Sequence, residues 1–119
     1  MHEMSLISFT LDAVEQAAKA HGIRRVTEIR IVVGELRMAL DDQLQTAFRL
    51  LTGDRPLFEG AELHIEKRPV CLRCTACGEI YPSSIPRIGR DVCPACGSEE
   101  FAIESGRELY IDSFEGDEI

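Results

Sequence analysis

The chain has 119 residues, of which 45% are hydrophobic and 29% are charged, and its formal net charge is -8. This length suits one modest domain with a small appendage, and the hydrophobic fraction excludes a chain that is disordered throughout. An acidic chain repels nucleic-acid phosphates, and no run of about 18 apolar residues is available to span a membrane. The composition therefore predicts a soluble protein with neither nucleic acid nor a membrane as its partner.

The first part of the chain reads as a helix followed by a strand. Apolar residues at helical spacing predict an amphipathic helix over residues 4–20, with Gly22 at its stop. Its predicted core stripe consists of Met4, Ile7, Leu11, Val14 and Ala18. Alternating, β-branched residues predict a strand over 26–33, and Gly34 marks a bulge or the strand's end.

A second helix and two further strands follow. Either Asp41 or Asp42 is expected to cap the helix, which Gly53 ends. Its predicted apolar stripe consists of Leu44, Ala47, Phe48 and Leu51. Alternation predicts a strand over 61–67, a third strand is expected over 109–114, and residues 115–119 are expected to fray.

The segment between these two strands has a different character. Residues 68–97 contain all five cysteines and four of the five prolines, with little regular periodicity. A segment of this size cannot build a core of its own, so a bound metal is the natural substitute. We therefore predict an α+β fold, in which an inserted four-cysteine zinc-ribbon unit joins a small mixed α/β platform of about three strands and two helices. The expected domains are the platform, 1–67 with 106–119, and the zinc-binding domain, 68–105.

Four cysteines have the spacing of a metal site. Cys74 and Cys77 form one Cys-x2-Cys pair, Cys93 and Cys96 form another, and a glycine follows each pair. Two such turns supply a tetrahedral set of sulfurs for Zn²⁺. Because four protein ligands leave no open coordination position, the zinc is expected to be structural, and no enzymatic activity is expected.

Cys71 introduces an alternative ligand, because Cys71 and Cys74 also have Cys-x2-Cys spacing. Only Cys77 is followed by glycine, which favours the pair Cys74 and Cys77. Cys71 is then a small, partly buried residue at the end of a strand. Cysteines in close pairs without a secretory signal also favour metal binding in a reducing compartment, so we expect a cytoplasmic protein.

The chain begins Met1-His2-Glu3, which places an imidazole beside a terminal amine. The amine, the following amide nitrogen and the imidazole of His2 can chelate one ion, and such a nitrogen set suits Ni²⁺ or Cu²⁺. Taken alone, a histidine at this position is usually a solvated side chain. If it binds a metal, affinity should fall as the pH approaches about 6.5, because the imidazole must be deprotonated.

The whole chain resembles the HypA/HybF family of nickel metallochaperones for hydrogenase maturation, from Met1 to about Glu115. The resemblance includes the opening Met1-His2-Glu3, Val33-Gly34-Glu35-Leu36, Ala47-Phe48, Glu59-Gly60-Ala61-Glu62-Leu63 and both glycine-flanked cysteine pairs. It implies that the Met1 amine and His2 bind nickel, with Glu3 contributing its amide or tuning the site. It also implies a structural zinc at the four cysteines. Cys71 departs from the family pattern.

The resemblance further implies delivery of nickel to the large-subunit precursor of [NiFe] hydrogenase, together with a HypB-type GTPase, and some members assist urease. The chain itself has no phosphate-binding glycine loop of the GxxxxGK[ST] type, so it is not the GTPase. We expect a monomer or a weak homodimer. The alternative hypothesis is a zinc-ribbon module that binds protein or nucleic acid without handling nickel. Basic residues near the cysteine pairs favour this alternative, and the net charge opposes it.

Overall fold

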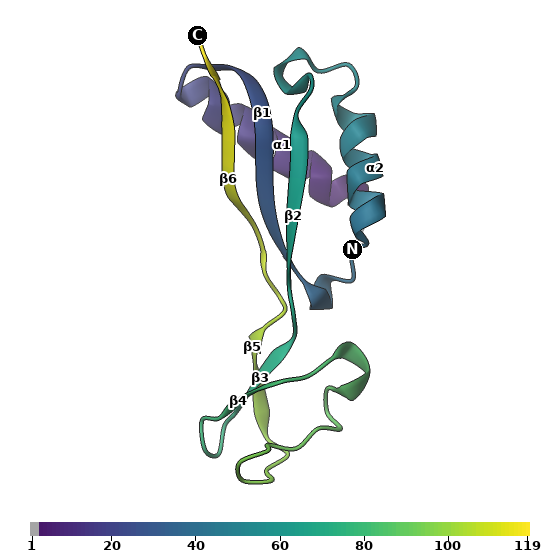
Figure 1. Cartoon of the computed structure of the whole chain (residues 1–119), viewed down its shortest axis with the longest axis vertical. Helices are drawn as coiled ribbons and strands as arrows, with labels where there is room; N and C mark the ends of the chain where they lie inside the picture. Colours follow the sequence, from purple (N-terminus) through teal and green to yellow (C-terminus); the bar gives the residue numbers. More distant parts are fainter. Residues whose placement is uncertain (1–2) are drawn as a thin grey trace. The chain divides into compact units, whose positions relative to one another are not determined.

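The structure is a computed structural model that describes residues 3–119, and within them the chain divides into two compact units. The first unit contains the residues up to Val32, Ala39–Glu66 and Tyr110–Ile119, and the second contains Val33–Met38 and Lys67–Leu109. Two helices and two three-stranded sheets confirm the predicted α+β class (Figure 1). No helix in this described part of the chain is both long and apolar enough to cross a membrane.

The first unit is built on a sheet with strand order β2-β1-β6. Strand β1 (Ile23–Gly34) lies in the centre, between β2 (Glu62–Arg68) and β6 (Leu109–Glu118). Helices α1 (Glu3–Ala20) and α2 (Asp41–Thr52) contact each other and pack with this sheet (Figure 1). A short 3₁₀ turn, η2 (Pro56–Phe58), precedes β2 and buries Phe58. The core of this unit is mostly aliphatic.

The buried face of α1 differs from the predicted stripe at one end. Ile7, Leu11, Val14 and Ala18 are buried, but Met4 is 46% exposed. Leu6 and Thr10 are buried instead, so the face is rotated toward that side of the helix. Thr10 satisfies its hydroxyl within the helix, because its Oγ1 donates to the carbonyl of Leu6 at 2.9 Å.

The predicted cap of α2 is wrong. Leu40 occupies the N-cap position without a side-chain hydrogen bond, and both Asp41 and Asp42 lie in the first turn. Negative charge there still favours the helix, because the first turn carries the positive end of the helix dipole. The predicted stop is confirmed, since Gly53 follows the last helical residue with a φ of -58°.

The C-terminal residues expected to fray are instead part of the sheet, because β6 continues to Glu118. The hydroxyl of Thr27 donates to the carbonyl of Glu115 at 3.2 Å, and Arg25 pairs with Asp117 at 3.1 Å. These pairs run in opposite chain directions, so β1 and β6 are antiparallel. The amide of Ile119 donates to Gly22 at 2.8 Å. The sequence did not predict this part of the strand because residues 115–118 are polar and show no alternation of apolar residues. Residues of an edge strand that face water need not be apolar.

The second unit contains a small sheet with strand order β4-β3-β5. Strand β3 (Cys71–Cys74) pairs antiparallel with β4 (Ile80–Pro82) and with β5 (Phe101–Ser105). The second unit also contains two 3₁₀ turns, η1 (Glu35–Arg37) and η3 (Ile85–Arg87). The sequence showed little periodicity here because strands of this length contribute only one or two inward residues each.

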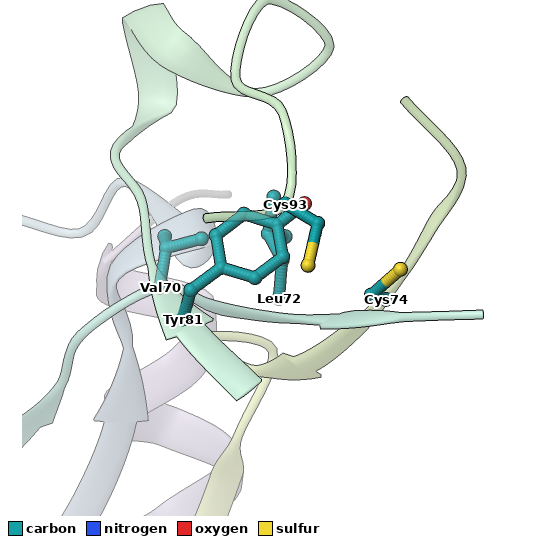
Figure 2. Packing of buried hydrophobic residues seen from close by; sticks show 5 residues of the cluster. All are labelled: Val70, Leu72, Cys74, Tyr81 and Cys93. Atoms are coloured by element: carbon teal, nitrogen blue, oxygen red, sulfur yellow. The ribbon is translucent and has the colours of Figure 1, made fainter. Parts of the chain in front are cut away.

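A small core fills the second unit (Figure 2). Its buried members are Val70, Leu72, Cys74, Tyr81 and Cys93, and the partly buried Leu36, Ile88, Phe101 and Ile103 pack against them. The segment therefore has a core, contrary to the expectation that metal alone would replace one. Leu36 reaches this core from residues 33–38, where the amide of Leu36 donates to the carbonyl of Gly106 at 2.8 Å.

Gly34 allows a close approach between two backbone segments of this unit. Its amide donates to the carbonyl of Glu108 at 2.7 Å, and a Cβ at Gly34 would lie 2.0 Å from the carbonyl oxygen of Gly106. Because the obstacle is backbone and not a flexible side chain, the two segments would have to separate.

We predict that Gly34→Ala lowers the free energy of unfolding by about 1–3 kcal/mol, because the added methyl group forces this separation. Gly53→Ala is the matched control, since a Cβ at Gly53 would lie 3.5 Å from the nearest atom and its φ suits alanine. Denaturant unfolding of both variants tests this prediction. Equal stability of the two variants would contradict it.

We also predict that truncation after Phe114 exposes the amides of residues 22–27 to hydrogen exchange, because the pairing of β6 with this part of β1 is lost. Hydrogen exchange followed by NMR measures the effect. The double variant Glu99→Gln/Glu100→Gln, in the other unit, controls for a general loss of acidic charge. Unchanged protection after truncation would restore the view that the tail frays.

Candidate metal centre

The four cysteines with zinc-ribbon spacing come together in the second unit. Cys74 ends β3, Cys77 lies in the turn that follows, and Cys93 and Cys96 lie in the loop before β5. All four sulfurs lie within 4.8 Å of one another. The Sγ atoms of Cys74 and Cys96 are 3.6 Å apart, and those of Cys77 and Cys93 are 3.5 Å apart. Each of these short separations therefore joins a cysteine of the first pair to a cysteine of the second pair.

The two cysteine turns have the same backbone conformation. The amide of Gly78 donates to the carbonyl of Cys74, and that of Gly97 to the carbonyl of Cys93, both at 2.8 Å. Each turn is closed by a second hydrogen bond, from Cys74 to Glu79 at 2.8 Å and from Cys93 to Ser98 at 2.9 Å. The glycines have φ angles of +84° and +77°, which other residues rarely adopt. This explains why glycine follows each pair.

Backbone N–H groups in these turns point at the sulfurs. The amide of Ala95 donates to the Sγ of Cys93 at 3.4 Å. In the other turn, burial raises the pKa of Cys74, but hydrogen bonds from the backbone of Cys77 and Ala76 and from the Cys96 thiol lower it to about 6. The turn therefore stabilises a thiolate, the form that binds metal ions.

The pKa values of two neighbouring thiols, Cys77 and Cys96, are raised. The backbone of Glu79 lowers the pKa of Cys77, but its hydrogen bond with Cys93 and its burial raise it to about 12. For Cys96, the backbone of Ser98 lowers the pKa, and the hydrogen bond with Cys74 raises it, with a net upward shift. The cause is the proximity of four sulfurs that cannot all become negative unless a cation compensates them.

The sulfur arrangement fits a tetrahedral metal ion. Four sulfurs that bind one Zn²⁺ at about 2.3 Å are separated by about 3.8 Å along the edges of a tetrahedron. The measured separations of 3.5 and 3.6 Å are close to that value. One cysteine of each turn is buried and the other is exposed, so the group lies at the surface of the unit's core. Within residues 3–119, these four side chains form the group that could hold a metal.

Cys71 lies outside the four-sulfur group, and the strand explains why. Side chains alternate along β3, where Leu72 and Cys74 are buried. Cys71 is three residues from Cys74, so its sulfur lies on the opposite face of the strand. The geometry favours Cys74 over Cys71, as the glycine after Cys77 suggested.

Two residues that sequence reasoning missed support the site. Asp91 accepts hydrogen bonds from Ser83 at 2.8 Å and from the Arg87 Nε at 3.0 Å, which fixes the loop two residues before Cys93. The Tyr81 ring packs beside Cys93 in the core (Figure 2). Burial, followed by the charges of Cys93 and Cys74, raises the pKa of Tyr81. Neither residue has a metal-ligand spacing that could have identified it.

The proposed nickel residues are not brought together in the described structure. Met1 and His2 lie outside the described residues, and Glu3 occupies the first turn of α1. The other two histidines lie elsewhere. His21 follows α1, and its amide donates to carbonyls of the last helical turn. His64 lies on β2, where its Nε2 is 2.8 Å from a carboxylate oxygen of Glu28.

Comparison with known sequences identifies a family. Residues 1–116 match the family model described as "Hydrogenase/urease nickel incorporation, metallochaperone, hypA". The chain is 35% identical to the hydrogenase maturation factor HypA of Moorella thermoacetica, covering 98% of this chain and all of the relative. It is 39% identical to the HypA of Chlorobaculum parvum, covering 95% of this chain and 96% of the relative.

Solved structures agree on the fold. The chain matches the solution structure of a HypA protein with a TM-score of 0.73 and 25% identity, covering 98% of this chain and 96% of that one. It also matches the nickel metallochaperone HypA of Helicobacter pylori with a TM-score of 0.70 over the full length of both chains, at 24% identity. Both the family model and the curated relatives span nearly the whole chain. The chain therefore belongs to the HypA family of hydrogenase and urease nickel-incorporation metallochaperones.

Proposed function

We propose that this chain binds Ni²⁺ at its N-terminus and delivers it for the maturation of [NiFe] hydrogenase, with urease as a second client class. The match to the nickel-incorporation family over residues 1–116 carries this proposal, because it includes the opening Met1-His2-Glu3. The proposed nickel ligands are the Met1 amine and His2, with Glu3 contributing its amide or tuning the site. The proposed partners are a HypB-type GTPase and the hydrogenase large-subunit precursor.

We further propose that Cys74, Cys77, Cys93 and Cys96 hold a structural Zn²⁺. The spacing of the sulfurs and the N–H groups directed at them support this assignment. When bound, zinc would neutralise thiolate charge and cross-link two turns that are 15 residues apart in sequence. In this proposal residues 1–67 with 106–119 form the nickel-binding platform, and residues 68–105 form the zinc-binding domain.

The two proposed sites suit different tasks. A closed set of four sulfurs exchanges its ion slowly, whereas nitrogen donors at a chain terminus permit exchange. The alternative is a zinc-ribbon module that does not handle nickel. The basic side chains of the second unit give little support to nucleic-acid binding by such a module. Arg73 lies 3.4 Å from Glu104 and Arg87 lies 2.8 Å from Asp91, so part of the basic charge is already paired. Paired cations attract phosphates weakly.

We predict that Cys74→Ser abolishes stoichiometric zinc and unfolds the second unit, because a structural zinc contributes folding energy directly. Cys71→Ser is the matched control and should retain zinc, because its sulfur lies on the opposite face of β3. Elemental analysis and NMR of the purified chains measure both effects. Loss of zinc from Cys71→Ser, with retention in Cys74→Ser, would refute this ligand set.

We predict that His2→Ala abolishes nickel binding while zinc stays at one ion per chain. An added residue before Met1 should weaken nickel binding as well, because it converts the terminal amine into an amide. Isothermal titration with Ni²⁺, with zinc measured in parallel, tests both changes, and His21→Ala is the matched control. Equal nickel affinity of the extended and unextended chains would refute the role of the amine. Full nickel binding by His2→Ala would refute the carrier proposal.

A further inference from the structure

The outer edge of the platform sheet is open along β6. This strand is last in the order β2-β1-β6, and its ten residues make it long for an edge strand. Among the strands of residues 3–119, β6 has only β1 as a neighbour in this sheet. Backbone N–H and C=O groups on that side of an edge strand are available to another extended chain.

The opposite edge of the same sheet is partly covered, and a space of about 780 Å³ between α2 and β2 is lined in part by Leu63 and His64. Helix α2 lies beside β2 (Figure 1). The side-chain amide of Gln45, on this helix, donates through its Nε2 to the backbone carbonyl of Leu63 at 2.7 Å. This side chain satisfies an edge carbonyl that would otherwise attract a partner strand. A helix and a side-chain hydrogen bond therefore obstruct strand addition at β2, which favours β6 as the edge where a strand could be added.

An apolar groove runs beside β6. A space of about 390 Å³ lies between α1 and β6, lined by Ala13, Val14, Ala17, Ile111, Asp112, Ser113 and Phe114. The small side chains of Ala13 and Ala17 keep it open, and Ile111 and Phe114 make the strand side apolar. A strand added at this edge would direct alternate side chains toward the helix side, where an aliphatic group could enter the groove.

The charges along β6 specify the partner. Residues 109–119 include four acids and no lysine or arginine. Asp117 is paired with Arg25, whereas Asp112, Glu115 and Glu118 are exposed and have no ion pair within residues 3–119. Opposite charges on neighbouring strands attract and like charges repel. A second copy of this strand would therefore be repelled, and a basic strand would be attracted.

We propose that β6 is a docking edge for an extended, basic segment of a partner polypeptide. In this arrangement the segment pairs its backbone with β6, directs aliphatic side chains into the groove beside α1, and directs lysine or arginine toward Asp112, Glu115 and Glu118. The proposal goes beyond metal binding and does not depend on the nickel assignment, because none of these residues is a proposed metal ligand.

A blocked peptide of alternating lysine and valine is the probe, titrated into the zinc-loaded full chain and followed by NMR amide shifts. Shifts and slowed hydrogen exchange are expected at residues 110–118 and at α1 residues facing the groove. Asp112→Lys/Glu115→Lys should weaken binding about tenfold or more. Glu99→Lys/Glu100→Lys is the matched control, because it makes the same change in net charge in the other unit and should leave affinity within about twofold.

A second probe with N-methyl groups on alternate residues tests backbone pairing and should bind more weakly than the first. Equal weakening by the two charge-reversal variants would overturn the proposal, since it would show attraction to net charge alone. Shifts centred on β2 or the cysteine turns, or no binding at a peptide concentration of about 1 mM, would also overturn it. Sedimentation that shows dimers formed through β6 would replace the basic partner with a second copy.

Discussion

The mutual proximity of four sulfur atoms is the constraint on which the second unit depends. Cys74 and Cys93 belong at once to its small core and to the sulfur group, so packing and metal binding share the same residues. The backbone turns direct N–H groups at the sulfurs, but these dipoles do not compensate four negative charges. A dication at the centre would remove that conflict and fix the two turns together, which links the folding of this unit to metal binding.

The two proposed metals differ in how the chain holds them. The sulfur group is assembled by residues from β3 and from the loop before β5, so its geometry depends on the fold of a whole unit. The proposed nickel donors, by contrast, are consecutive at the start of the chain and need no tertiary contact to meet one ion. A site of this local kind can release its ion without disturbing the fold, which is the property that a carrier needs.

The edges of the platform sheet show a comparable asymmetry. Gln45 of α2 binds a carbonyl of β2, whereas β6 presents acidic side chains and an apolar groove to solvent. Acidic charge on an open edge opposes pairing between identical strands. In the docking proposal, the same charge attracts a basic partner strand.

Local patterns in the sequence were enough for several features. Helical spacing located both helices, and alternation located β1 and β2, because burial on one face imposes a period on the residues themselves. Paired Cys-x2-Cys turns with glycines identified the sulfur group, because each turn is formed within a few residues. The HypA family was recognisable for the same reason, since its motifs are short and occur in order.

Other features are decided by contacts between residues distant in sequence, and no local pattern encodes these. Only the fold shows that Leu36 joins the core of the second unit and that residues 115–118 form a strand. Only the fold separates Cys71 from Cys74, because pairing in the sheet decides which face of β3 turns inward. The sequence by itself determined the helices and strands of the platform and the cysteines that could bind a metal. The tertiary structure decided which surfaces are covered and which stay open, because burial is a property of neighbours brought together by folding.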